Sequence, residues 1–205
     1  VSDNPAATMV AVVQHNAGTD VEQNLSTLET LSAQAASEGA QLVTWAEAFA
    51  YLGSHDGKKD ILESLPDGGP ILERCQRLAR RLNCDLLLGG FHEAMPGDTE
   101  RCYNTSVYLN SRGEISAMYR KIHLFDVSIP SGPQLMESKQ TGPGDQAICV
   151  ETLFGILGLT ICYDVRFPAL YQRLVEKGAM ALTVPSAFTA TTGAAHWHVL
   201  LRARA

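Results

Sequence analysis

The stretch from residue 156 to residue 168 reads ILGLTICYDVRFP, an apolar run that ends at a cysteine and passes through a turn. The apolar residues 156–161 predict a buried strand, and Pro168 is typical of the first position of a helix. Cys162 therefore lies between a strand end and a helix start, where the positive end of the helix dipole favours a thiolate. We expect Cys162 to be a nucleophile.

Two other predicted strands end in the same way. Residues 41–45 run into Glu47, and residues 115–120 run into Lys121. Because sites in layered α/β folds assemble at strand ends, the sequence predicts that an acid, a base and a thiol meet there.

These three side chains specify a reaction type. The carboxylate of Glu47 can take the thiol proton, the thiolate can attack a carbonyl carbon, and the ammonium of Lys121 can stabilise the oxyanion. The backbone N–H of Tyr163, one residue past the cysteine, is the natural second oxyanion donor. The same carboxylate can then protonate the departing amine and activate water. The pattern predicts amide hydrolysis through a thioester, and we expect neither a cofactor nor a metal ion.

Strands and helices alternate in some parts of the chain and form hairpins in others, which indicates a mixed sheet with helices on its outer faces. We expect strands at residues 9–14, 41–45, 85–91, 103–110, 115–120, 147–150, 156–161 and 179–184. We expect helices at residues 20–39, 70–82 and 168–177 and from residue 194 onward. Residues 122–145 are rich in proline and glycine and predict a long irregular segment, which in a compact domain is usually functional.

Composition describes one soluble globular domain, with 205 residues of which 45% are hydrophobic and 19% charged. The formal net charge of -6, without a long basic run, argues against a nucleic-acid partner. No apolar stretch has the length of a membrane helix, so we expect no membrane partner. Five cysteines without a CxxC pair favour a reduced, intracellular setting.

Three segments resemble the motifs of the nitrilase superfamily, the carbon-nitrogen hydrolases. They are TWAEAFAYLG at residues 44–53, YRKIHLFDVSIP at 119–130 and LTICYDVRFPALYQ at 159–172. The resemblance extends from about residue 9 to residue 205 and implies that Glu47, Lys121 and Cys162 form a catalytic triad. It also implies an α/β fold, the α-β-β-α sandwich of two mixed sheets with outer helices, and a homo-oligomer.

Further segments resemble one nitrilase-like branch of this superfamily. They are GGFHE at residues 89–93, the CYDVRFP run and residues 185–205. That branch hydrolyses deaminated glutathione to 2-oxoglutarate and cysteinylglycine, which implies a small-molecule amide substrate and a cytoplasmic, and also mitochondrial, location. In LMESKQTGPG, Glu137 matches the accessory glutamate that holds the lysine. The resemblance also implies that Arg166, Phe188 and Thr192 contact the substrate.

The chain departs from the family pattern at two places. Ala46 precedes Glu47 where the family usually has proline, so we expect a looser backbone and lower activity. Family chains normally continue past the final RARA with further strands. We therefore interpret residues 1–205 as a single carbon-nitrogen hydrolase domain that is incomplete at its C-terminus, with open sheet edges that expose apolar surface.

Several alternatives stay open at this point. One is an ω-amidase that releases ammonia from 2-oxoglutaramate, and another is a truncated, inactive interaction protein. A third is a cysteine–histidine hydrolase, for which His123 lies closest to the lysine motif. A metal site at His196 and His198 lacks a cysteine or carboxylate partner at ligand spacing.

Overall fold

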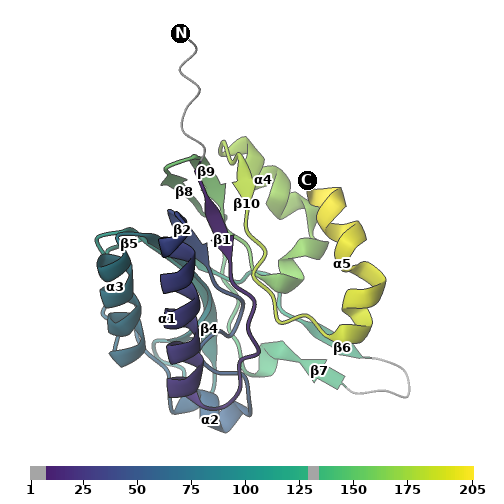
Figure 1. Cartoon of the computed structure of the whole chain (residues 1–205). Coiled ribbons are helices and arrows are strands. Elements are labelled where there is room, and N and C mark those ends of the chain that lie inside the picture. The colour runs from purple at the N-terminus through teal and green to yellow at the C-terminus, as the bar shows by residue number, and fades with distance from the viewer. Residues whose placement is uncertain (1–7, 129–133) are drawn as a thin grey trace.

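The computed structural model describes residues 8–128 and 134–205, and it confirms the predicted α/β class (Figure 1). The larger sheet has the order β1-β2-β3-β4-β5, with β1 (Val10–Val12), β2 (Leu42–Thr44), β3 (Asp85–Ala94), β4 (Cys102–Leu109) and β5 (Ile115–Arg120). Strands β1, β2 and β3 run parallel to one another, whereas β4 runs antiparallel to its neighbours β3 and β5, so the sheet is mixed.

A second mixed sheet has the order β10-β9-β8, formed by β8 (Cys149–Thr152), β9 (Gly155–Gly158) and β10 (Ala181–Leu182). A separate antiparallel pair joins β6 (Asp126–Ser128) to β7 (Gln134–Met136). The α-helices are α1 (Val21–Ser37), α2 (His55–Lys59), α3 (Pro70–Leu82), α4 (Pro168–Glu176) and α5 (Ala190–Arg204). Two 3-10 helices, η1 (Glu137–Lys139) and η2 (Cys162–Arg166), complete the described elements.

Two hydrophobic cores lie on opposite faces of the larger sheet. Along β3, Leu86 and Leu88 pack in the core that contains α1 and α3, whereas Leu87 packs in the core shared with β9 and α4. This alternation follows from the two-residue period of a strand. The layers are therefore α1 and α3, the larger sheet, the smaller sheet, and α4 with α5, as Figure 1 shows.

Some predicted boundaries are confirmed. Helix α3 has the predicted bounds, with Pro70 at its start and Asn83 in the left-handed conformation at its end. Asp20 caps α1 by accepting a hydrogen bond from the Gln23 N–H at 3.0 Å. The predicted hairpin forms β4 and β5.

Other predictions need correction. The apolar run at residues 9–14 predicts a buried strand, yet Val10 and Val12 are 41% and 82% exposed. An apolar pattern predicts a strand but does not reveal whether another element covers it. The segment at 122–145, predicted to be irregular, contains β6, β7 and η1; its residues 129–133 lie outside the described part of the chain.

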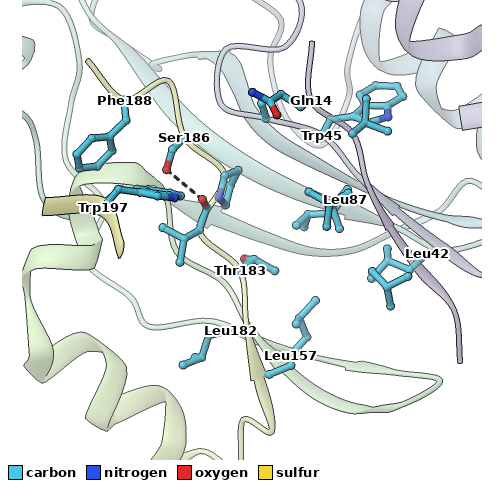
Figure 2. Close-up of a pocket in the computed structure, with 18 of the residues that line it drawn as sticks. Gln14, Leu42, Trp45, Leu87, Leu157, Leu182, Thr183, Ser186, Phe188 and Trp197 are labelled. Carbon is cyan, nitrogen blue, oxygen red and sulfur yellow. Dashed lines mark hydrogen bonds between the residues drawn. The ribbon is translucent and has the colours of Figure 1, made fainter. Parts of the chain in front are cut away.

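A wide apolar hollow of about 1060 Å³ separates β1 and β2 from β10 and the start of α5. Figure 2 shows Leu42 and Leu87 on one side of it and Leu157 and Leu182 on another, with Trp197 beyond. This hollow is not lined by Glu47, Lys121 or Cys162. No helix in residues 8–128 and 134–205 is long and apolar enough to cross a membrane.

Candidate active site

Glu47, Lys121 and Cys162, which follow β2, β5 and β9 in the chain, line one common cavity of about 390 Å³. Lys121 Nζ lies 3.0 Å from Glu47 Oε1. The three residues are only 9%, 2% and 8% exposed, so their charges interact with little screening by water. The structure thus brings together the side chains that the sequence predicted would meet.

Lys121 is held between two carboxylates. Its Nζ donates to Glu47 and to both oxygens of Glu137, each at 3.0 Å. Glu137 is itself fixed by the Phe125 N–H, which donates to Oε2 at 2.6 Å. Burial acts to lower the pKa of Lys121, but the two negative charges dominate and raise it above its ordinary value. The lysine is therefore an ammonium, and Glu137 lies where an accessory glutamate was expected.

Glu47 accepts two more hydrogen bonds that sequence reasoning missed. Asn104 Nδ2 donates to Oε1 at 2.9 Å, and the Ala187 N–H donates to Oε2 at 2.8 Å. Burial acts to raise the pKa of Glu47, but the Lys121 charge and the Ala187 hydrogen bond outweigh it, so this pKa lies below its usual value. Glu47 is thus a carboxylate, held firmly even though Ala46 precedes it.

The β4–β5 register is the signal that could have revealed Asn104. Thr105 pairs with Arg120, which places Asn104 beside Lys121, and the Lys121 N–H donates to the Asn104 carbonyl oxygen at 2.9 Å. No comparable signal exists for Ala187, because it contributes only its main-chain N–H.

Cys162 has a strained backbone, with φ of +48°, a left-handed conformation that favours glycine. The Cys162 N–H donates to the Pro185 carbonyl oxygen at 2.9 Å, and the preceding Ile161 N–H donates to Asp164 Oδ2 at 2.9 Å. These bonds hold the sharp turn that presents the thiol to the cavity. Within the described residues the Tyr163 N–H has no hydrogen-bond acceptor, as an oxyanion donor requires.

The predicted thiolate is wrong for the resting site. Burial raises the pKa of Cys162 well above its ordinary value, and the negative charge of Glu47 raises it further, while Lys121 opposes this only in part. The expected help from a helix dipole is weak, because η2 is a five-residue 3-10 helix and α4 begins only at Pro168. The resting cysteine is a thiol beside a carboxylate.

The predicted substrate contacts divide into two groups. Phe188 and Thr192 line the cavity, as does Tyr163. Arg166 is not among the described lining residues; its guanidinium carbon lies 5.6 Å from the ring centroids of Tyr163 and Phe188, and its Nη2 lies 3.2 Å from His196 Nδ1. Arg166 therefore contacts two residues of the cavity wall without lining the cavity itself.

His123 is bonded to residues other than the cavity cysteine. Its Nδ1 lies 2.8 Å from Asp164 Oδ1, and its ring stacks on Phe167 with 3.7 Å between centroids. It is absent from the described lining of the cavity, which gives a cysteine–histidine pair no geometric support. Within residues 8–128 and 134–205, no cluster of three or more His, Cys, Asp or Glu side chains is arranged to hold a metal ion.

Comparison with known proteins agrees with this geometry. The sequence profile of the family described as carbon-nitrogen hydrolase matches residues 9–205, so the chain belongs to the carbon-nitrogen hydrolase family. Among its relatives, the human deaminated glutathione amidase is 45% identical over 200 residues, covering 96% of this chain and 61% of the human protein. The chain thus spans less than two thirds of the length of this relative.

Solved structures lead to the same family. The crystal structure of the NitFhit protein from C. elegans matches with a TM-score of 0.88 and 38% identity, covering 95% of this chain and 47% of that one. A mutant of the amidase from Nesterenkonia sp. AN1, with acrylamide added at its active-site cysteine, matches with a TM-score of 0.78 and 26% identity, covering 97% and 74% of the respective chains. The predicted nitrilase-like sandwich is therefore confirmed.

Proposed function

We propose that the protein is a thiol amidase with Glu47, Lys121 and Cys162 as its catalytic residues. The observation that carries this proposal is the buried carboxylate–ammonium pair, with Lys121 Nζ 3.0 Å from Glu47 Oε1, in the same cavity as the Cys162 thiol. The amidase of Nesterenkonia, in which acrylamide is added at an active-site cysteine, supports a cysteine as the reacting group.

The reaction starts from the charge states described above. Glu47 accepts the Cys162 proton as the sulfur attacks the amide carbonyl carbon, and the Lys121 ammonium and the Tyr163 N–H stabilise the oxyanion. Glu47 then gives the proton to the leaving nitrogen as the carbon–nitrogen bond breaks, which leaves a thioester. Glu47 next takes a proton from water, and the hydroxide oxygen attacks the thioester carbon. The carbon–sulfur bond breaks, the acid leaves, and the proton returns to the sulfur.

The proposed substrate is deaminated glutathione, cleaved to 2-oxoglutarate and cysteinylglycine. Support comes from the human relative, which carries the name deaminated glutathione amidase and is 45% identical to this chain. A cavity of about 390 Å³ suits a small acyl group. In this proposal Glu137 positions Lys121, Phe188 and Thr192 touch the substrate, and Arg166 acts through the wall residues that it contacts.

The test is turnover of deaminated glutathione and of 2-oxoglutaramate, with intact mass spectrometry during each reaction. We expect an adduct on Cys162 and faster release of cysteinylglycine than of ammonia. Cys162→Ala and Glu47→Gln should lower turnover by at least about 10³-fold. Cys149→Ala, which changes a cysteine outside this cavity, is the matched control. Retained turnover in Cys162→Ala would end the thiol mechanism, and faster ammonia release would favour the ω-amidase alternative.

We further propose a homo-oligomer in a reducing compartment, the cytoplasm or the mitochondrion. No residue of α5 is buried, and Val199 on this helix is 62% exposed, as expected of a surface that another copy covers. All five cysteines are unpaired, which suits a reducing compartment. Light scattering after size-exclusion chromatography tests the assembly, and a monomer mass at all concentrations would contradict it. Fluorescence microscopy of the tagged protein in cells tests the compartment.

A further inference from the structure

Among the described charged side chains that line the cavity around Cys162, one ammonium has no carboxylate partner. Among the described lining residues, the carboxylates are Glu47 and Glu137, and the lysines are Lys58 and Lys121. An ammonium has three N–H donors. Lys121 directs its donors to one oxygen of Glu47 and both oxygens of Glu137, so it has none left for a bound substrate anion.

Lys58 lies on the short helix α2 and lines the cavity around Cys162. It is half-buried, and its ammonium makes no hydrogen bond or ion pair to any residue in 8–128 or 134–205. The next residue, Lys59, does not line the cavity, and its Nζ pairs with Glu100 Oε2 at 2.9 Å. Two adjacent lysines therefore differ in environment, one facing the cavity and the other engaged at the surface.

The other basic side chains near the cavity cannot replace Lys58. Burial lowers the pKa of His92 to about 4, so this lining residue is neutral at physiological pH. Arg166 does not line the cavity among the described residues and lies against His196 instead.

The net charge of the cavity lining determines whether it can hold an anionic substrate. Glu47, Glu137 and Lys121 together carry one net negative charge, which repels an anion in a site with little water. The charge of Lys58 brings the lining to neutrality and supplies a donor for a charge-assisted hydrogen bond.

We propose that Lys58 binds a carboxylate of the substrate and thereby selects amides whose acyl chain is negatively charged. This assignment deepens the proposed amidase function and rests on it. Lys58 is a specificity residue: it holds the far end of the acyl chain while Cys162 attacks the carbonyl carbon.

The test compares two amides of nearly equal shape, glutaramate and the neutral 5-methylhexanamide. For each enzyme the measured quantity is the ratio of kcat/KM for glutaramate to that for the neutral amide. In Lys58→Met this ratio should fall about 10- to 100-fold, mainly through KM, because one charge-assisted hydrogen bond is lost. Lys58→Arg should keep most of the ratio, and the matched control Lys59→Met should leave it unchanged. A ratio in Lys58→Met within about twofold of the wild-type ratio would overturn the assignment.

Equilibrium binding of glutarate separates this inference from the proposed function. Calorimetry should show glutarate binding about 10- to 100-fold more weakly to Lys58→Met than to the wild type or Lys59→Met. If the wild type hydrolyses no amide but glutarate binding still depends on Lys58, the amidase proposal fails and the carboxylate site stands. If glutarate binds both lysine variants equally, the carboxylate site fails whatever the enzyme hydrolyses.

Discussion

Replacing Asn104 tests whether the Glu47 carboxylate must be held in its ionised form. Asn104→Ala removes the Nδ2 donor 2.9 Å from Glu47 Oε1 and leaves the donors from Lys121 and Ala187 in place. A hydrogen bond to a charged group contributes about 1.5–3 kcal/mol, so kcat/KM should fall about 10- to 100-fold. Because the lost bond favoured the ionised carboxylate, the pKa of Glu47 should rise. The acidic limb of the pH profile should therefore move to higher pH, with the largest loss of activity at low pH.

The assay is amide turnover across pH, with thermal unfolding measured in parallel. Asn110→Ala, which changes an asparagine bonded to Glu114 in the β4–β5 turn, is the matched control. Asn104→Asp keeps the shape of the side chain but replaces the donor with a carboxylate, so it should be less active than Asn104→Ala. An unmoved acidic limb, or an Asn104→Asp variant more active than Asn104→Ala, would refute the reasoning.

Three further changes have expected outcomes. Lys121→Met leaves buried carboxylates without a cation and should lower the free energy of unfolding by about 3–5 kcal/mol at neutral pH. Without that cation the pKa of Glu47 rises above its unfolded value, so the stability of the variant should recover as pH falls toward about 4.3. Urea unfolding measures this stability, and an equal loss at pH values of about 5 and 7 would contradict the expectation. Glu63→Ala removes a buried carboxylate that accepts the Ile71 and Leu72 N–H groups at 2.6 and 3.0 Å at the start of α3. This substitution should lower the free energy of unfolding, measured by chemical denaturation, by about 2 kcal/mol and should leave kcat unchanged. A change in kcat would show that α3 is coupled to the site. Cys162→Gly should have a free energy of unfolding about 1 kcal/mol higher than that of Cys162→Ala, because φ at this position is +48°. Chemical denaturation measures the difference, and the opposite order would mean that the backbone is unstrained.

The order of strands and helices was predictable because it depends on local patterns. Pro70 at the start and a helical apolar period determine α3, and a short turn between two strands determines the β4–β5 hairpin. The convergence of Glu47, Lys121 and Cys162 was also predictable, since each residue follows a strand. These features need only neighbours in sequence and the general geometry of sheets.

What escaped prediction depends on contacts between distant parts of the chain. The exposure of Val12 depends on what lies over β1, and the pairing of Lys59 with Glu100, which distinguishes it from Lys58, joins residues 41 positions apart. The protonation of Cys162 is of the same kind. Its position after a strand indicated a thiolate, but burial and the nearby charge of Glu47 oppose ionisation and prevail.

That protonation has a consequence for how Lys121 works in the proposed reaction. All three N–H donors of the ammonium are used at rest, one of them on Glu47. When the thiol proton passes to Glu47, the carboxylate becomes neutral and its hold on that donor weakens. The donor is released as negative charge develops on the substrate oxygen, while Glu137 keeps the lysine in place. Proton transfer and oxyanion stabilisation are then one coupled event, which a permanent thiolate would not provide.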